Sequence, residues 1–189
     1  AGIDLFFASR VLRPVRWHGT TLTIVHDLAW LENARGMQDL SCLAHRLFAN
    51  RMIIGSETVV SDSPRTTRQL QKLVSDQLSI HTLPPQISEN FHICRQVESA
   101  RRSILLVGGQ SPGKNGILAL HLFAMLARER DDLELVIVGG KSWKNKELYK
   151  TYAALAGGIR QRVRMAGFVA ENELIQLYQS SVLTLFPSF

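Results

Sequence analysis

A glycine-rich turn that carries a lysine is the stretch of this sequence best suited to binding chemistry. Residues 108–115 read Gly-Gly-Gln-Ser-Pro-Gly-Lys-Asn and follow the apolar run 104–107, which predicts a strand buried on both faces. Gly108 and Gly109 have no Cβ atom, so the backbone there can turn sharply and approach a ligand. The ammonium group of Lys114 adds a positive charge. This combination predicts a site for an anionic group.

A helix is expected to begin directly after this turn. Asn115 is a predicted N-cap, and residues 116–130 have apolar positions at helical spacing. A helix N-terminus offers unpaired backbone N–H groups and roughly half a positive charge. Together with Lys114, these groups favour a phosphate or a diphosphate as the ligand. Glycine turns after buried strands also occur without a ligand, so a purely structural turn is the competing interpretation.

A histidine and an aspartate follow another predicted strand. Residues 21–25 are rich in branched side chains and lead directly into His26 and Asp27. Ligands of parallel α/β sheets bind at the carboxyl ends of the strands. Imidazole titrates near neutral pH and a carboxylate can fix its tautomer, so the pair is predicted to do acid–base or orienting work. The alternative is that the adjacent side chains point apart and Asp27 only starts a turn.

The elements that must position these residues alternate between short apolar strands and helices. Strands are predicted over residues 3–7, 21–25, 58–61, 78–83, 104–107, 133–138, 163–165 and 182–186. Helices are predicted over residues 39–54, from Pro64 onward, over 116–130, from after Gly140 to near Gly157, and over 171–180. Alternating strands and helices, with nearly all-apolar strands, predict parallel sheets with helices on both faces.

Two helices of the first half have clear signals of their own. Ser63 is a predicted N-cap with Pro64 in the first helical turn. The helix over 39–54 carries an apolar stripe that is expected to face the core. The stripe consists of Leu40, Leu43, Ala44, Leu47 and Phe48.

The predicted fold class is α/β, with two Rossmann-like parallel-sheet domains. Residues 1–83 form the first predicted domain and residues 103–189 the second. Residues 84–102 contain two prolines and no periodic pattern, which predicts an interdomain linker. The sequence begins without Met or a basic leader and stops directly after an apolar run, so no signal peptide is expected and each domain is expected to be incomplete.

Composition narrows the class of protein. Hydrophobic residues make up 46% and charged residues 20% of 189 residues, which is typical of a globular protein, and no apolar run is long enough to span a bilayer. The net charge is +6, but the basic residues are scattered, so no nucleic-acid partner is expected. The excess of positive charge favours phosphorylated ligands or an anionic membrane surface as partners. Cys42 and Cys94 stand alone, which predicts a reducing compartment, no disulfide and no metal site.

The lysine turn also differs by one residue from a P-loop, G-x-x-x-x-G-K-[ST]. Asn115 stands where a P-loop has a hydroxyl that ligates magnesium. The strand predicted over 133–138 is followed by Gly139 instead of the aspartate that would bind the metal. A P-loop-like NTPase therefore remains as an alternative.

Several segments, in order, resemble the group 1 (family 4) glycosyltransferases, retaining enzymes of the GT-B fold. In the second half they are Val-Gly-Gly-Gln-Ser-Pro-Gly-Lys-Asn at 107–115, Val-Ile-Val-Gly at 136–139, Arg-Val-Arg-Met-Ala-Gly-Phe-Val at 162–169, Glu-Leu-Ile-Gln-Leu-Tyr at 173–178 and Phe-Pro-Ser at 186–188. In the first half they are residues 4–9, Val-His-Asp-Leu at 25–28 and Val-Val-Ser at 59–61.

The resemblance implies transfer of a sugar from a nucleotide-diphosphate donor to a saccharide or lipid-linked acceptor, without a cofactor or metal ion. It places the acceptor side in residues 1–83 and the donor side in residues 103–189. It implies a cytoplasmic protein, with peripheral contact at the inner face of the membrane as a further expectation. The implied catalytic residues are His26 and Asp27, and the implied donor-binding residues are Gly108, Gly109, Lys114, Asn115, Gly139, Phe168 and Val169.

The sequence also departs from the family's pattern. Many members have arginine where Gly109 stands and another basic residue where Gly113 stands, so diphosphate binding here would depend on Lys114 and backbone N–H groups. The loss of one charge-assisted contact costs roughly 2–3 kcal/mol. The sequence stops before the family's Glu-Gly-Phe-Gly stretch, so these residues alone are expected to be inactive or very weak. A non-catalytic binding remnant of a GT-B protein is the third alternative.

Overall fold

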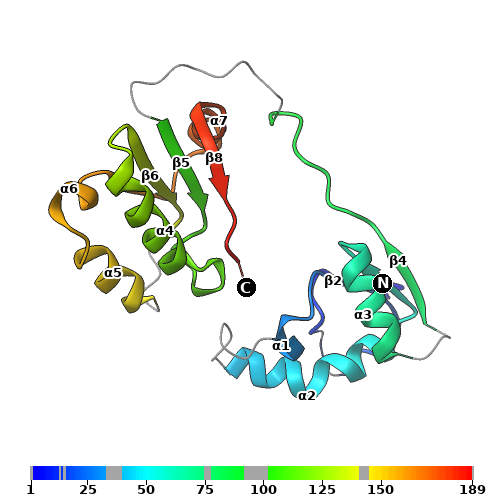
Figure 1. The fold of residues 1–189 in the computed structure, drawn as a ribbon. Helices are drawn as coiled ribbons and strands as arrows, with labels where there is room; N and C mark the ends of the chain where they lie inside the picture. The colour runs from blue at the N-terminus through cyan, green and yellow to red at the C-terminus, as the bar shows by residue number, and fades with distance from the viewer. Residues whose placement is uncertain are drawn as a thin grey trace. The chain divides into compact units, whose positions relative to one another are not determined.

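The structure, a computed structural model, forms two compact units. The first unit is Ala1–Ile87 and the second is Ser88–Phe189. The structure describes residues 2–12, 14, 16–32, 40–74, 78–91, 102–140 and 145–188. Much of the predicted linker, together with Cys94, lies outside these residues, as does the side chain of Cys42. Each unit is an α/β layer structure of its own (Figure 1).

A four-stranded parallel sheet organises the first unit. Its order is β1-β2-β3-β4, which means that neighbouring strands follow one another along the chain. The strands are β1 (Leu5–Ala8), β2 (Thr20–Val25), β3 (Thr58–Ser61) and β4 (Ser79–Thr82). The helices are α1 (Ala29–Glu32), α2 (Leu40–Ile54) and α3 (Pro64–Leu73). Ser63 caps α3 as the sequence predicts: its hydroxyl accepts a hydrogen bond from the N–H of Thr66 at 3.2 Å.

The described helices of the first unit pack on one face of its sheet. Val25 and Val59 lie in one buried cluster with side chains of all three helices, among them Ile53 of α2 and Leu70 of α3. Residues that point to the opposite face, such as Ile24 and Val60, are only half-buried. Helices on both faces were expected, and in this unit the described part does not have them.

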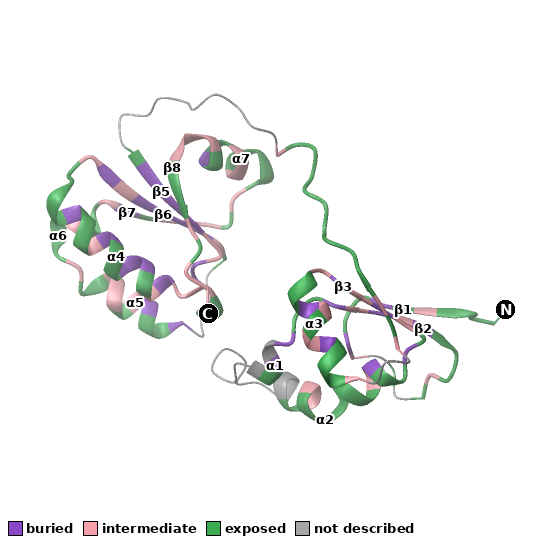
Figure 2. Ribbon diagram, turned by 45° about the vertical axis from the view of Figure 1, so that its right-hand side comes forward, coloured by how far each residue is buried: buried purple, intermediate pink, exposed green. Residues whose placement is uncertain are grey.

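The prediction that an apolar stripe buries α2 is wrong for three of its five residues; Ala44 is half-buried, and the side chain of Leu40 lies outside the described residues. Leu43 and Leu47 are 54% and 63% exposed, and Phe48 is also exposed. The side chains of α2 that enter the core are Ala49 and Ile53. The reason is that α2 is apolar around most of its circumference, so periodicity could not identify the packed face. Figure 2 shows the exposed side of this helix in green.

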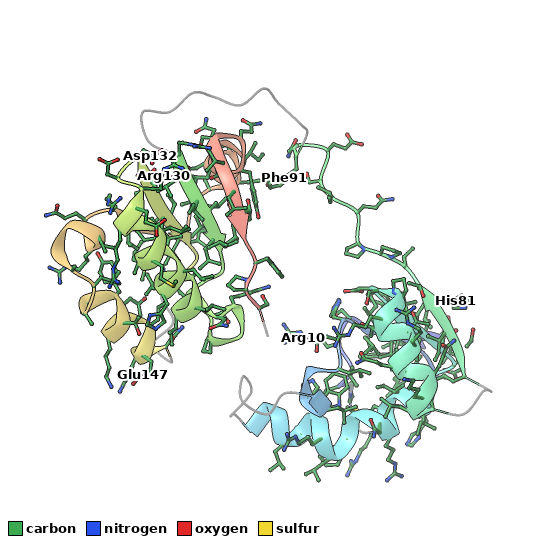
Figure 3. All side chains as sticks on the ribbon, viewed as in Figure 1. Arg10, His81, Phe91, Arg130, Asp132 and Glu147 are labelled. Atoms are coloured by element: carbon green, nitrogen blue, oxygen red, sulfur yellow. The ribbon has the colours of Figure 1, made fainter. Side chains whose placement is uncertain are left out.

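A second four-stranded parallel sheet organises the second unit, in the order β7-β6-β5-β8. The strands are β5 (Arg102–Val107), β6 (Leu133–Val138), β7 (Val163–Gly167) and β8 (Ser181–Leu185). The helical elements are a 3-10 turn (Pro112–Lys114), α4 (Gly116–Glu129), α5 (Lys146–Ala153), α6 (Gly157–Arg160) and α7 (Glu171–Ser180). Arg130 makes a two-pronged contact with Asp132 at 2.9 and 2.8 Å just before β6 (Figure 3).

Both faces of the second sheet are covered, which explains its continuous apolar strands. Leu106 of β5 and Ile137 of β6 point to one face and pack with α4, α5 and α6. Leu105 and Val136 point to the other face and pack with Leu177 of α7. The α/β fold class predicted from the sequence is confirmed. The predicted helix after Gly140 is instead two helices, α5 and α6, separated by a short turn.

Candidate functional site

Three glycines lie in a row at the carboxyl edge of the second sheet. Gly108 follows β5, Gly139 follows β6, and Gly167 ends β7. All three have positive φ angles, of 72°, 138° and 74°. The N–H of Gly108 donates to Val138 at 2.7 Å, and the N–H of Gly139 donates to Gly167 at 2.7 Å. The ends of these three strands therefore lack a Cβ atom at neighbouring positions, which lets a ligand approach the backbone.

Gly139 lies close against the backbone of Gly108, which explains why Gly139 carries no side chain. A Cβ atom on Gly139 would lie 3.2 Å from the Cα atom of Gly108. Its φ angle already excludes most other residues. The pair fixes how closely the ends of β5 and β6 approach each other.

Lys114 lies at the β5 end of this glycine row. Its side chain lies along Gly108, because a Cβ atom built there would be 3.4 Å from Cγ of Lys114. The Nζ atom lies 4.3 Å from the centre of the Phe186 ring, and Phe186 follows β8 on the other side of β5. In Figure 1 the C-terminal segment after β8 ends close to the turn after β5. The lysine is therefore directed over the carboxyl ends of β5 and β8.

Gly109 has a packing role that the sequence did not indicate, and its predicted donor contact stays a prediction. It is buried, and a Cβ atom there would lie 2.3 Å from Cδ2 of Leu106 and 3.1 Å from Cγ2 of Ile137. The missing side chain would point into the core and not over the glycine row. A side chain at this position would not fit the backbone that this turn adopts.

Asn115 occupies the N-cap position of α4 as predicted, but its side chain does not cap the helix. Its backbone is left-handed, with φ 51° and ψ 46°, and its side chain makes no capping hydrogen bond. Asparagine tolerates this conformation better than most residues. The 3-10 turn ends here when the N–H of Asn115 donates to Pro112 at 3.1 Å. The start of α4 is thereby left without a side-chain cap that would compete with an anion.

A buried polar network that sequence reasoning missed holds the turn in place. The amide of Asn145 donates to the carbonyl of Gln110 at 3.1 Å, and its oxygen accepts from the N–H of Leu148 at 3.2 Å, which caps α5. The hydroxyl of Tyr149 donates to Oε1 of Gln110 at 2.7 Å. Gln110 is only 2% exposed. An asparagine before a helix is an N-cap signal in the sequence, but its partner 35 residues away is not.

Phe168 and Val169 follow the last glycine of the row. Phe168 is 89% exposed and Val169 is half-buried against the α7 side of the sheet. The segment therefore presents backbone groups and an open aromatic ring at the end of β7. An open hollow elsewhere in this unit is lined by none of the predicted donor-binding residues. Its lining is Asn90, Glu171, Asn172, Ile175, Gln176 and Gln179.

His26 lies at the carboxyl edge of the first sheet, as predicted, but its hydrogen-bonded carboxylate is Asp62. Nδ1 of His26 is 2.6 Å from Oδ2 of Asp62, and Nε2 is 3.1 Å from the carbonyl oxygen of Ser9. The hydrogen bond to Asp62 raises the pKa of the His26 imidazole, and the negative charge of the neighbouring Asp27 adds to this. Asp62 is one residue beyond a predicted strand, so the edge argument used for His26 would have found it.

The predicted site residues fall into two groups, one in each unit. Gly108, Gly139 and Lys114 lie together at one sheet edge, and Phe168 is next to the last glycine of that row. His26 and Asp27 lie at the sheet edge of the first unit. Among the residues that the structure describes, no three His, Cys, Asp or Glu side chains gather as metal ligands. Within the same residues, no helix is long and apolar enough to cross a membrane.

Residues 92–189 match the model of the family described as "Glycosyl transferases group 1". No curated protein matches the sequence significantly.

Several solved structures share the fold. WaaG, a glycosyltransferase involved in lipopolysaccharide biosynthesis, is 17% identical with a TM-score of 0.69, over 99% of this chain and 54% of WaaG. HepE of Anabaena in complex with UDP and glucose is 16% identical with a TM-score of 0.67, over 90% of this chain and 46% of HepE. TarM is 11% identical with a TM-score of 0.65, over 90% of this chain and 32% of TarM. The chain thus spans between a third and about half of these proteins.

Proposed function

Because this chain belongs to the group 1 glycosyl transferases, we propose that the protein transfers a sugar from a nucleotide-diphosphate donor to an acceptor. The observation that carries the proposal is the position of Lys114 beside Gly108 and over the ends of β5 and β8, next to the glycine row. In a parallel α/β sheet this edge is the ligand-binding edge. Negative charge grows on the leaving diphosphate as the glycosidic bond breaks, and a fixed cation there stabilises it.

The residues proposed to contact the donor lie at the carboxyl edge of the second sheet. Lys114 and the uncapped start of α4 contact the two phosphoryl groups in this proposal. Gly108 and Gly139 let the donor approach the backbone, with Gly139 near the nucleoside. Phe168 and Val169 lie by the nucleobase, where backbone groups can read its edge. Residues 103–189 then form the donor side, residues 84–102 the linker and residues 1–83 the acceptor side, with His26 and Asp27 as the proposed catalytic residues.

The finer assignment is to the retaining enzymes of family 4 with the GT-B fold. The acceptor is a saccharide or a lipid-linked glycan. Support comes from relatives of the same fold: WaaG is involved in lipopolysaccharide biosynthesis, and TarM of S. aureus was solved with α-GlcNAc-glycerol and UDP. We propose that no metal ion or cofactor takes part, because cationic side chains and N–H groups supply the charge.

The P-loop alternative has less support. β6 is followed by Gly139 and Gly140 where a P-loop protein has a metal-binding aspartate. Asn115 supplies an amide in place of the magnesium-binding hydroxyl. A non-catalytic binding remnant differs from both enzymes in that nucleotides would neither bind nor react.

The test is a transfer assay on the natural full-length protein with a set of nucleotide sugars, with and without EDTA. Release of the nucleoside diphosphate together with a glycosylated acceptor, unaffected by EDTA and with retained anomeric configuration, supports the proposal. Magnesium-dependent ATP hydrolysis without sugar transfer favours the P-loop protein. Absence of both activities, together with absence of thermal protection by nucleoside diphosphates, favours the binding remnant.

We also propose a cytoplasmic location with peripheral contact at the inner face of the membrane. The support is the exposed side of α2, where Leu47, Phe48 and Ile54 lie on the same helix as the exposed Arg51. Sedimentation with anionic vesicles tests it. Leu47→Ser and Phe48→Ser should reduce binding, whereas Leu126→Ser, at an exposed position of α4, should not.

A further inference from the structure

The contact between His26 and Asp62 is produced by strand register. β2 and β3 pair so that Val25 lies opposite Ser61. His26 directly follows β2 and Asp62 directly follows β3, so their side chains lie side by side at neighbouring strand ends. The 2.6 Å contact between Nδ1 and Oδ2 follows, with the Asp62 side chain only 30% exposed. The pair is therefore set by the sheet and not by a long loop.

The second ring nitrogen also meets an acceptor. Nε2 of His26 is 3.1 Å from the carbonyl oxygen of Ser9, which follows β1. A carboxylate and a carbonyl can only accept hydrogen bonds, so both contacts form only when both ring nitrogens carry a hydrogen. A neutral ring would point a lone pair at one of the two acceptors. The geometry therefore favours the imidazolium form.

The elements around His26 carry charged groups of both signs. Asp62 after β3 and Asp27 next to the ring are anions that favour the charged ring. Arg10 follows Ser9, and Arg65 lies in the first turn of α3. The atoms that contact the ring itself are oxygen acceptors. The ring is 54% exposed, so it is open to a ligand while held on two sides.

We propose that Asp62 is a positioning residue that holds His26 as an imidazolium, so that His26 offers a sugar ligand at this sheet edge a positive charge and an N–H group instead of acting as a base. The identity of the ligand rests on the proposed function, but the state of the ring does not. On binding, the Nε2–H group exchanges the Ser9 carbonyl for an oxygen of that ligand. No proton leaves the ring in this step, and Asp62 stays ionised.

Ring-nitrogen NMR of the 189-residue chain tests the state of the ring. Long-range ¹H–¹⁵N spectra are recorded across the neutral pH range, with His26→Gln to assign the signals. The wild-type ring should show two protonated nitrogens below neutral pH, with a titration midpoint above that in Asp62→Asn. Asp62→Glu should restore part of the difference, and Asp27→Asn should lower the midpoint less than Asp62→Asn. A neutral tautomer in the wild type below neutral pH overturns the proposal, as does a midpoint that Asp62→Asn leaves unchanged.

The pH profile of transfer by the natural full-length protein tests the consequence. The turnover number should fall at high pH as the ring loses its proton, and Asp62→Asn should move this fall to lower pH with a smaller change in KM for the donor. Asp132→Asn, which removes the partner of Arg130 in the other unit, should not move it. If Asp62→Asn has the same pH profile of transfer as the wild type, the proposed role of Asp62 is wrong. Absence of transfer with every donor would instead refute the proposed function, while the NMR result would still decide the state of the ring.

Discussion

The ammonium nitrogen of Lys114 lies 4.3 Å from the centre of the Phe186 ring. The two residues follow neighbouring strands: Lys114 lies in the turn after β5, and Phe186 directly follows β8. An aromatic face attracts a cation by about 0.5–1 kcal/mol at an exposed site. The contact keeps the long lysine side chain extended over the strand ends, where one side of its charge stays available to an anion.

Lys114→Ala should weaken the binding of UDP by about 30-fold, because one charge-assisted contact of about 2 kcal/mol is lost. Isothermal titration of the wild type and the variant measures the change. The control is Lys146→Ala, at an exposed position of α5 that contributes nothing to the glycine row. Equal affinities of Lys114→Ala and wild type would refute the role of this lysine.

Phe186→Leu should weaken UDP binding by only about two- to fivefold, since it removes the contact that orders Lys114 and leaves its charge. The same titration measures it. In the double variant with Lys114→Ala, the additional loss from Phe186→Leu should disappear, because the ring acts through the lysine. An undiminished effect in the double variant would show that Phe186 acts by another route.

Gly109→Ala should destabilise the chain by about 1–3 kcal/mol, because the new Cβ atom overlaps Leu106 and Ile137 in a packed core. Gly113→Ala is the matched control on the same turn, since a Cβ atom there has nothing within 4 Å. Urea denaturation of the two variants measures the difference. Comparable unfolding midpoints would contradict the packing role of Gly109.

Tyr149→Phe should destabilise the second unit by about 1–2 kcal/mol, because the buried side chain of Gln110 loses its hydrogen-bond donor. Tyr152→Phe on the same helix is the control, as that ring only packs against the edge of the core. Thermal unfolding compares the variants. If the network also orders the turn, UDP should bind Tyr149→Phe more weakly than Tyr152→Phe.

The stability of the first unit should depend on pH through His26. The folded-state pKa is raised by Asp62, so the stabilisation is fully present below the unfolded value of about 6.5 and is lost as pH rises through the raised value. Asp62→Asn should therefore be most destabilising below about pH 6.5. Since the ring is half exposed, the difference should be no more than about 1 kcal/mol. The control is His121→Gln on α4, and a pH-independent difference would contradict the prediction.

The sequence by itself determined the local elements and the order in which they occur. The bounds of β3, β6 and α7 were predicted to the residue, because apolar periodicity and turn residues act over short distances. It also determined that Lys114 follows a glycine turn after a buried strand, which is enough to indicate an anion site. The α/β class follows from the alternation of these elements.

Only the tertiary structure decided which residues meet. The buried face of α2 was mispredicted because most of its surface is apolar, and the choice depends on what packs against it. The partner of His26 is Asp62, 36 residues away, because the register of β2 against β3 places them together. Gly109 faces the core and Gly108 faces Lys114 because the backbone between them turns. Contacts between distant residues depend on pairing and packing, and local pattern carries no information about either.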